Sequence, residues 1–581
     1  MTVSVGSIIH PEGVHTIEVS TPEEMDRFLG ELDANKERWV QTSIERRIEY
    51  LELIMARTRA LAERWTRLAC DAKGIAFDEP VSSEEWNSGP HLTIRNARLL
   101  RNSLRDILEH GTPQFPGPVT TRKGQTVVGV FPTDIYDRLL WTGIKAEIWM
   151  EPGVTPADLA ATQALAYGDD ADQVGRVSLV LGAGNIASIP PMDVMYKLFA
   201  ENEVVLLKMN PVNEYLGPLF ADVFADMIDD GFMRIVYGGA AEGDYLSHHE
   251  LVGSIHMTGS DKTHDAIVFG PGEEGAARKA ADDPVLDKPF SSELGSVTPV
   301  IIVPGPWSEK DLQHQGKNIS AMLTHNAGFN CIAARVVVTP ESWTLRDRLI
   351  DAIKNGLSIT PERPAYYPGA EDRWKAFLKE HPEAAGFGET TPGTVPWTLI
   401  EGLRAESTGD VCFTTESFTG LFAEASIPSP GSTAEYLRRA VQFCNEDLWG
   451  TLGATIIVHP KSLKDPEVRS AVNEAIADLR YGTVCVNLWT GVGFFSTSAT
   501  WGAFPGSPRN DIQSGHGVVH NTYLFDRPQK SVMWGPFRTP VKPLWFADHK
   551  TKHHVTKKMV DLDADPSPGK LPGIFWLASR G

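Results

Sequence analysis

The sequence predicts an α/β fold in which a doubly wound sheet unit is followed by a second α/β unit. Runs that favour strands alternate with runs that favour helices, starting at Val177–Leu181 and continuing through a glycine-rich turn to a helix near residues 192–200. A strand at Val204–Lys208 and a helix over about 215–229 repeat the alternation. Such alternation is typical of parallel sheets that carry nucleotide-sized crevices at their strand ends.

The regions on either side extend this layout. The first 110 residues place apolar side chains three and four residues apart over 23–29 and 43–70, which predicts helices that serve as scaffold. The segment 359–393 is rich in proline, glycine and acidic residues and is expected to be a surface excursion. Further strands are expected at 234–237, 254–257, 297–303, 335–339, 450–458 and 482–487.

Composition excludes several classes of partner. The chain has 581 residues, 42% of them hydrophobic and 22% charged, which is a soluble globular composition long enough for two or three domains. A formal net charge of -21 argues against binding to nucleic acid or to an anionic membrane, because both require clustered cations. No apolar run approaches the roughly 18 residues of a spanning helix. The first seven residues carry no basic group, so export is not expected and the cytoplasm is the predicted location.

The cysteines argue against both a disulfide framework and a metal site. They are odd in number, lie far apart and include no C-x-x-C pair, which predicts a reducing compartment and no bound metal. They are Cys70, Cys331, Cys412, Cys444 and Cys485.

One cysteine lies in a context that indicates covalent catalysis. The run Asn326-Ala-Gly-Phe-Asn-Cys331 follows the glycine-marked turn Glu293-Leu-Gly295, so a thiol nucleophile and a carboxylate base are both available. A thiol reacts as thiolate, and we expect residues 332–335 to open a helix whose free N–H groups point at the sulfur. Gly328 lets the backbone come close. The alternative is that Cys331 is a small buried hydrophobic residue.

The turn after the first strand offers a competing interpretation. Residues 182–187 match the G-x-G-x-x-A dinucleotide fingerprint, but the next strand ends in Lys208 where that fingerprint requires an acid, and Pro190-Pro191 is expected to delay the helix start. A lysine at this point suits contact with a ribose hydroxyl or a phosphate. Chain reversal alone would also explain the glycines.

Taken together and in order, these motifs resemble the aldehyde dehydrogenase superfamily over about residues 130–530. The resemblance implies an NAD(P)-binding domain in residues 1–290 with an oligomerisation arm at about 134–155, a catalytic domain in 291–505, and a C-terminal oligomerisation segment in 506–581 with a strand near 541–546. The motifs that carry it are Asn185, Lys208, Met257-Thr-Gly-Ser260, Glu293-Leu-Gly295, Asn326 to Cys331, Glu416-Ser-Phe418 and Gln513-Ser-Gly-His-Gly517.

The resemblance also implies roles for individual residues. Cys331 would attack an aldehyde, the Asn185 amide and the Cys331 backbone N–H would stabilise the oxyanion, and a nicotinamide would accept the hydride. Glu293 would then activate the water that hydrolyses the thioester. The implied contacts to NAD or NADP are Lys208 and Glu416 at the ribose, Phe418 beside the nicotinamide, Gly259 and Ser260 near the pyrophosphate, and Gly295.

The chain departs from the family pattern in three places. Pro211 stands where the family usually has an acid after the lysine, which leaves NAD and NADP both open. The second glycine of the pyrophosphate turn is replaced near His264, and Ser296-Val297 stands where a Gly-Lys is common.

Substrate and assembly are less closely defined. The aromatic segment 488–501 lies where the family closes its substrate tunnel, so Trp489, Phe494 and Phe495 predict an apolar aldehyde unless they only cover the core. A homodimer or homotetramer is expected. Three alternatives stay open: a CoA-acylating relative, a Rossmann hydride enzyme built on residues 182–187, and a noncatalytic oligomeric scaffold.

Overall fold

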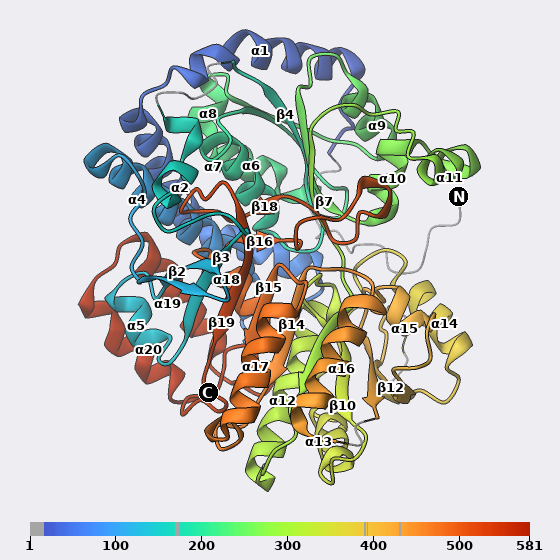
Figure 1. Cartoon of the computed structure of the whole chain (residues 1–581). Helices are drawn as coiled ribbons and strands as arrows, with labels where there is room; N and C mark the ends of the chain where they lie inside the picture. The colour runs from blue at the N-terminus through green and yellow to red at the C-terminus, as the bar shows by residue number, and fades with distance from the viewer. Residues whose placement is uncertain (1–16, 169–173, 389–390, 392, 429–430) are drawn as a thin grey trace.

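Over the described residues, the fold consists of two large sheets and one two-stranded pair, surrounded by helices (Figure 1). The computed structural model describes residues 17–168, 174–388, 391, 393–428 and 431–581. The first seven residues, on which the expectation about export depends, lie outside these ranges. Within them, no helix combines the length and the apolar character needed to cross a bilayer.

The smaller sheet is doubly wound, as predicted. Over the described residues it has six strands in the order β17-β8-β7-β4-β5-β6, and all neighbours run parallel except β17 and β8. Chain order reverses at β4, which has β5 on one side and β7 on the other, so the crevice that suits a ligand opens between them. The strands are β4 (Val177–Leu181), β5 (Val204–Lys208), β6 (Met233–Val236), β7 (Ser254–Gly259), β8 (Phe290–Leu294) and β17 (Gly515–His516).

Helices of this unit differ from expectation at two points. The helix α6 (Ile189–Phe199) starts before Pro190-Pro191 and contains them in its first turn, so the expected delay is wrong. Proline is tolerated there because first-turn N–H groups have no intrahelical partner. The helix expected over 215–229 is split at Phe224 into α7 (Gly217–Val223) and α8 (Ala225–Asp229). The others are α9 (Ala240–His248), α10 (Asp261–Phe269) and α11 (Gly272–Ala281).

The larger sheet joins the second α/β unit to the arm. Among the described residues it has eleven strands in the order β1-β2-β3-β19-β15-β14-β9-β10-β13-β12-β11. Strand β19 pairs parallel with β15 and antiparallel with β3, so the arm extends the sheet of its own chain. The strands are β1 (Val119–Arg122), β2 (Gln125–Phe131), β3 (Lys145–Met150), β9 (Thr298–Ile302), β10 (Ala334–Pro340), β11 (Ala385–Phe387), β12 (Trp397–Arg404), β13 (Leu421–Ile427), β14 (Gly453–Ile457), β15 (Thr483–Val486) and β19 (Pro528–Trp534).

Helices cover this sheet, and a two-stranded pair is separate from both large sheets. The strands β16 (Trp501–Gly502) and β18 (Val518–Val519) form a separate antiparallel pair. The helices of the second unit are α12 (Glu309–Thr324), α13 (Arg346–Ser358), α14 (Ala370–Glu380), α15 (Val411–Thr414), α16 (Thr433–Glu446), α17 (Pro466–Asp478) and α18 (Gly491–Ser496).

Two expectations about the second half of the chain are wrong. Residues 541–546 form no strand, because Pro540 and Pro543 lack the N–H groups that a ladder needs; the C-terminal strand is β19. The segment 359–393 is not only a surface excursion, since it contains α14 and the buried side chain of Tyr366.

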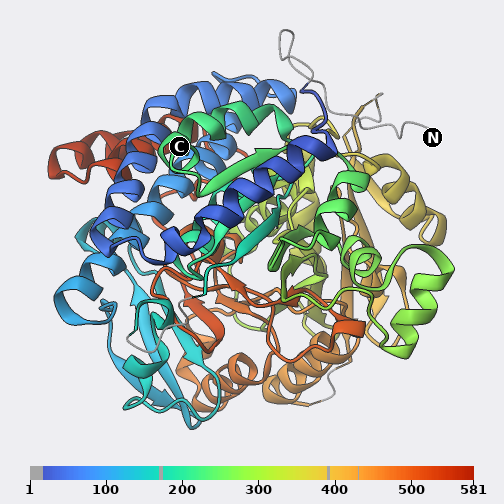
Figure 2. The same ribbon diagram turned by 90° about the horizontal axis from the view of Figure 1, so that it is seen from above.

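The N-terminal region is helical, as predicted. Helix α1 (Pro22–Val40) lies across the smaller sheet (Figure 2) and packs against β4, β5 and β6. Its start is fixed by Thr21, whose hydroxyl oxygen accepts the Glu24 N–H at 3.2 Å, and by Pro22 in the first turn. The region continues through α2 (Ile44–Ala72), α3 (Ser83–Trp86) and α4 (Leu92–His110).

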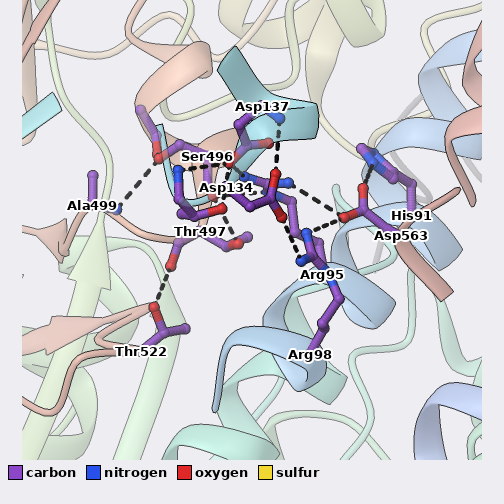
Figure 3. A network of polar contacts seen from close by, with 12 residues as sticks. His91, Arg95, Arg98, Asp134, Asp137, Ser496, Thr497, Ala499, Thr522 and Asp563 are labelled. Atoms are coloured by element: carbon purple, nitrogen blue, oxygen red, sulfur yellow. Dashed lines mark hydrogen bonds and ion pairs between the residues drawn. The ribbon is translucent and has the colours of Figure 1, made fainter. Parts of the chain in front are cut away.

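A buried ionic network attaches this region to both the arm and the C-terminus (Figure 3). From α4, Arg95 donates to Asp137 of α5 (Ile135–Leu140) at 2.8 Å. Arg95 and Arg98 both reach Asp563 of α19 (Lys552–Ala564), and His91 Nε2 lies 2.7 Å from its Oδ2. Although burial opposes ionisation, the two guanidinium groups hold the pKa of Asp563 far below its usual range. The chain ends in α20 (Leu571–Ala578), packed on α19.

Candidate active site

A cleft of about 880 Å³ opens at the carboxyl ends of β4, β5 and β7. It extends from the glycine turns of the smaller sheet to the loop that carries the cysteine. All nine residues predicted for catalysis and cofactor binding line it, although they come from six separate segments: Asn185, Lys208, Gly259, Ser260, Glu293, Gly295, Cys331, Glu416 and Phe418.

Cys331 lies in a loop between α12 and the central strand β10. The loop begins with a short 3-10 turn (His325–Gly328) in which Asn326 and Ala327 have left-handed φ angles of 53° and 55°. Gly328 is required where it stands, because a Cβ there would lie 2.6 Å from the Thr419 carbonyl oxygen. The tight turn brings the cysteine to the bottom of the cleft.

The helix expected to start after Cys331 does not exist. Residues 332–333 form a turn and β10 follows, because the β-branched run Val336-Val337-Val338 favours a strand. No helix N-terminus therefore lowers the thiol pKa. Instead, burial and the neighbouring carboxyl groups of Glu293 and Glu416 raise the pKa of Cys331 well above its ordinary value. The resting group is a neutral thiol, and its reactivity depends on a base.

Glu293 is the carboxyl group placed to serve as that base. It lies near the end of β8, it is 2% exposed, and its side chain contacts the Cys331 thiol. Burial raises its pKa to about 8, and the Asp193 and Glu416 carboxyl groups add to the shift. Among the described residues, its Oε1 atom has no hydrogen-bond partner. A buried acid with an unused oxygen and a pKa near neutrality matches the requirements of general acid–base catalysis.

Asn185 faces the same loop from the smaller sheet. Its side-chain amide donates to the Phe329 carbonyl oxygen at 2.9 Å, two residues before Cys331. An amide NH₂ has a second N–H. The side chain is thus fixed beside the nucleophile and keeps one donor that the Phe329 contact does not use.

The outer part of the cleft combines a cation, a carboxyl group and a helix start. Lys208 Nζ donates to the Gly238 carbonyl oxygen at 2.6 Å, and burial lowers its pKa to about 8. Burial raises the pKa of Glu416 to about 7, opposed by Arg335. A Cβ on Gly295 would lie 2.0 Å from Glu416 Oε2, so only glycine admits this carboxyl group. Ser260 caps α10, whose first turn faces the cleft.

Comparison with known proteins finds similarity to one family over part of the chain. The sequence profile of the aldehyde dehydrogenase family matches residues 187–364. The NADP-dependent glyceraldehyde-3-phosphate dehydrogenase of Streptococcus equinus is 29% identical over 161 residues, which are 27% of this chain and 30% of that protein. Aldehyde dehydrogenase family 3 member I1 of Arabidopsis thaliana is 26% identical over 182 residues, 31% of this chain and 30% of that protein. The chain therefore matches about 30% of the length of these curated relatives.

Solved structures share the fold over nearly the whole chain. Aldehyde dehydrogenase C of Pseudomonas syringae has a TM-score of 0.61 at 16% identity, covering 94% of this chain and 95% of that one. The NAD-dependent aldehyde dehydrogenase of Sinorhizobium meliloti has a TM-score of 0.61 at 14% identity, covering 93% and 92%. The chain is thus similar to the aldehyde dehydrogenase family in sequence over residues 187–364 and has the fold of aldehyde dehydrogenases over most of its length.

The aromatic residues predicted for substrate lie apart from the cleft. Trp489, Phe494 and Phe495 are at most 5% exposed and are absent from the cleft lining. The ring centroids of Trp489 and Phe495 are 5.6 Å apart, and the indole N–H of Trp489 donates to the Ile332 carbonyl oxygen at 2.9 Å. They pack directly behind the cysteine loop, and their role toward a substrate stays a prediction.

Several residues of the site were missed by sequence reasoning. Arg335 is buried and donates to the carbonyl oxygens of Gly328 (2.8 Å) and Thr419 (2.6 Å), which ties the cysteine loop to the Glu416 loop. Tyr367 and Arg373 line the cleft from the segment expected at the surface. Position directly after the cysteine motif could have suggested Arg335. Nothing in the local sequence indicates the other two.

One group of side chains resembles a metal site but is explained by helix capping. In the described part of the chain, His381, Asp410 and Cys412 place potential ligand atoms within 4.8 Å of one another. Asp410 Oδ1 accepts the Cys412 backbone N–H at 2.8 Å as the N-cap of α15, and His381 Nε2 lies 3.1 Å from the same atom. These hydrogen bonds account for the grouping.

Proposed function

We propose that this protein oxidises an aldehyde to a carboxylic acid with NAD or NADP, through a covalent adduct on Cys331. The observation that carries the proposal is the juxtaposition of a partly buried thiol with a buried carboxyl group whose pKa is raised to about 8, both lining a nucleotide-sized cleft. The names of the relatives support the reaction class, since they include NAD- and NADP-dependent dehydrogenases.

The residues that line the cleft fit a dinucleotide. Gly184 lets the turn after β4 pack closely against the Asn210 side chain, because a Cβ at Gly184 would lie 2.6 Å from Asn210 Oδ1. The first turn of α10 supplies backbone N–H groups suited to a pyrophosphate. Lys208 and Glu416 would hold ribose hydroxyls, and Phe418 would lie against the nicotinamide. Pro211 lines the cleft where a carboxylate would exclude a 2′-phosphate, so both NAD and NADP are proposed.

The chain's own groups perform the covalent steps. Glu293 accepts the thiol proton as Cys331 Sγ bonds to the aldehyde carbon, and the carbonyl oxygen becomes an oxyanion. The Asn185 side-chain amide and the Cys331 backbone N–H stabilise that charge; one such donor contributes roughly 3 kcal/mol. A bound nicotinamide supplies the hydride acceptor. The product on Cys331 is a thioester.

Hydrolysis uses the same carboxyl group a second time. Glu293, after losing its proton to solvent, accepts a proton from water while the water oxygen attacks the thioester carbon. The carbon–sulfur bond then breaks and releases the carboxylic acid with a free thiol. Burial keeps the Glu293 pKa at about 8, close enough to neutrality for both transfers.

The decisive experiment is an activity screen. Aldehydes of graded size and polarity are offered with NAD and NADP separately, and the product is identified as free acid or, with CoA present, as acyl-CoA. We expect free acid, formed most readily from apolar aldehydes, and no activity in Cys331→Ala. The matched control is Cys444→Ala, since Cys444 is buried in α16 and lies outside the cleft. Preferential acyl-CoA formation would establish acyl transfer to CoA instead.

Two further outcomes would indicate a different function. Oxidation that survives loss of Cys331 would favour a simple hydride enzyme built on residues 182–187. Absence of nicotinamide nucleotide binding would favour a noncatalytic scaffold. The proposed homodimer or homotetramer is tested separately by light scattering, with the arm at 134–155 as the expected interface.

A further inference from the structure

Lys73 connects the N-terminal helices to the cysteine loop. It caps the C-terminus of α2 and is 4% exposed. Its ammonium group donates to Glu85 Oε1 at 2.8 Å, to the Asn326 side-chain oxygen at 3.0 Å and to the Asn185 backbone oxygen at 3.1 Å. An ammonium group has three N–H donors. Two of the three thus bind segments that carry or precede proposed catalytic groups.

Asn326 connects Lys73 to other parts of the cysteine loop. Its side-chain amide donates to the backbone oxygens of Asn185 and Phe329, each at 3.1 Å, while its side-chain oxygen accepts from Lys73 and from the Tyr366 hydroxyl at 3.0 Å. The Phe329 oxygen is the acceptor that also orients the Asn185 amide. A displacement of Asn326 would therefore move both sides of the nucleophile.

The backbone at this point needs external support. Asn326 and Ala327 are both left-handed, a conformation that is strained for most non-glycine residues and persists only where the surroundings enforce it. Glu84 of α3 accepts the Asn326 backbone N–H at 3.0 Å. Arg363 lies 3.0 Å from the same carboxylate and, against the effect of burial, holds the Glu84 pKa at about 2. The N-terminal region thus supplies one anion, Glu84, and one cation, Lys73, to this strained turn.

We propose that Lys73 is a positioning residue of the active site, which acts by fixing Asn326 and, through it, the oxyanion donor Asn185 beside Cys331. The N-terminal helices then belong to the catalytic apparatus and are more than scaffold. This inference rests on the proposed function for its kinetic consequence, while its geometric content is independent of the reaction.

Lys73→Met tests the proposal by removing the donors and keeping the length of the side chain. The matched control is Lys530→Met, because Lys530 is also buried and lies outside the cleft lining; it donates to three backbone oxygens, those of Ile476, Ala477 and Leu479. We expect kcat to fall by tenfold to about a hundredfold in Lys73→Met, as for a misplaced reacting group, with the nucleotide Kd changed less than about threefold. Lys530→Met should lower thermal stability comparably and leave kcat within about threefold.

A double-mutant cycle separates positioning from general stabilisation. If Lys73 acts through Asn185, Lys73→Met should lower kcat by less than about threefold in an Asn185→Ala background, because the group it positions is already absent. If the fold-change in kcat of the double variant equalled the product of the fold-changes of the two single variants, the proposal would be overturned.

Hydrogen exchange supplies a readout that needs no activity. Amides of residues 183–187 and 325–331 should exchange faster in Lys73→Met and at wild-type rates in Lys530→Met. Unchanged exchange in Lys73→Met would reject the inference about Lys73, whatever reaction the protein catalyses. Conversely, a wild type with no aldehyde oxidation but with the expected exchange pattern would reject the proposed function and leave the positioning role intact.

Discussion

Glu293→Gln offers the sharpest test of the mechanism. Glutamine keeps the shape of the buried side chain but cannot accept a proton. With a pKa of about 8, the carboxyl group is ionised in about a tenth of molecules at pH 7 and about nine tenths at pH 9. If its ionised form activates water, the rate of thioester hydrolysis should rise about tenfold between these pH values in the wild type. The variant should lack this rise.

Stopped-flow kinetics measures the effect directly. In Glu293→Gln the thiol loses its proposed base but also one of the carboxyl groups that raise its pKa, so thiol attack should slow less than hydrolysis, because water, with a pKa near 15.7, ionises far less readily than a thiol. About one equivalent of reduced nucleotide per site should therefore appear in a burst, followed by a slow steady state, with an acyl adduct on Cys331 detected by mass spectrometry. Undiminished steady turnover would refute the reasoning. Turnover restored by CoA would support acyl transfer in place of hydrolysis.

The same variant has a consequence for stability. The pKa of Glu293 rises from 4.5 in the unfolded chain to about 8 in the folded protein. The folded protein therefore loses stability as the pH increases through that window, because the unfolded chain gives up the proton more readily. The full shift corresponds to about 5 kcal/mol as an upper bound. Glu293→Gln removes this penalty, so its thermal midpoint should exceed that of the wild type at pH 9 and approach it near pH 5. If the difference in thermal midpoint between variant and wild type were the same at pH 5 and pH 9, the raised pKa of Glu293 would be contradicted.

Three further substitutions probe the remaining parts of the site. Cys331→Ala should abolish oxidation while nucleotide affinity, measured by fluorescence titration, stays within about twofold, because no nucleotide contact is lost. Asn185→Ala should lower kcat by about a hundredfold without unfolding the protein; an unchanged kcat would assign the amide to loop structure alone. Gly295→Ala should displace Glu416, since the new Cβ would lie 2.0 Å from its Oε2, and weaken nucleotide binding by about tenfold or more. An unaltered Kd would exclude Glu416 as a ribose contact.

Local sequence patterns predicted the elements that position the site. The strands at 177–181 and 204–208 are found at those residues, and the long N-terminal helices lie where apolar spacing placed them. Such patterns succeed because a buried parallel strand and an amphipathic helix each impose a short-range requirement on side chains. The order of the motifs also allowed the sequence to group the residues that line the cleft, since most of them lie at or after the ends of strands of one sheet.

Expectations failed where a local preference competed with packing. The helix expected over 332–335 is absent, because the strand predicted at 335–339 begins at Ala334 as β10, an interior strand of the larger sheet between β9 and β13. The segment 359–393 has the composition of a loop, yet Tyr366 is buried against Asn185 and Asn326. The burial of Tyr366 is not encoded within a few residues of the site.

The sequence by itself determined the chemistry available to this protein: a thiol, a carboxyl group and an amide, each at or beside the end of a strand or helix. Only the tertiary structure decided their states. The pKa of Cys331 is raised and that of Glu293 reaches about 8 because the fold buries two acidic groups around one sulfur, an effect of distance and desolvation. The link from Lys73 to Asn326 spans 253 residues, and no local pattern can record it.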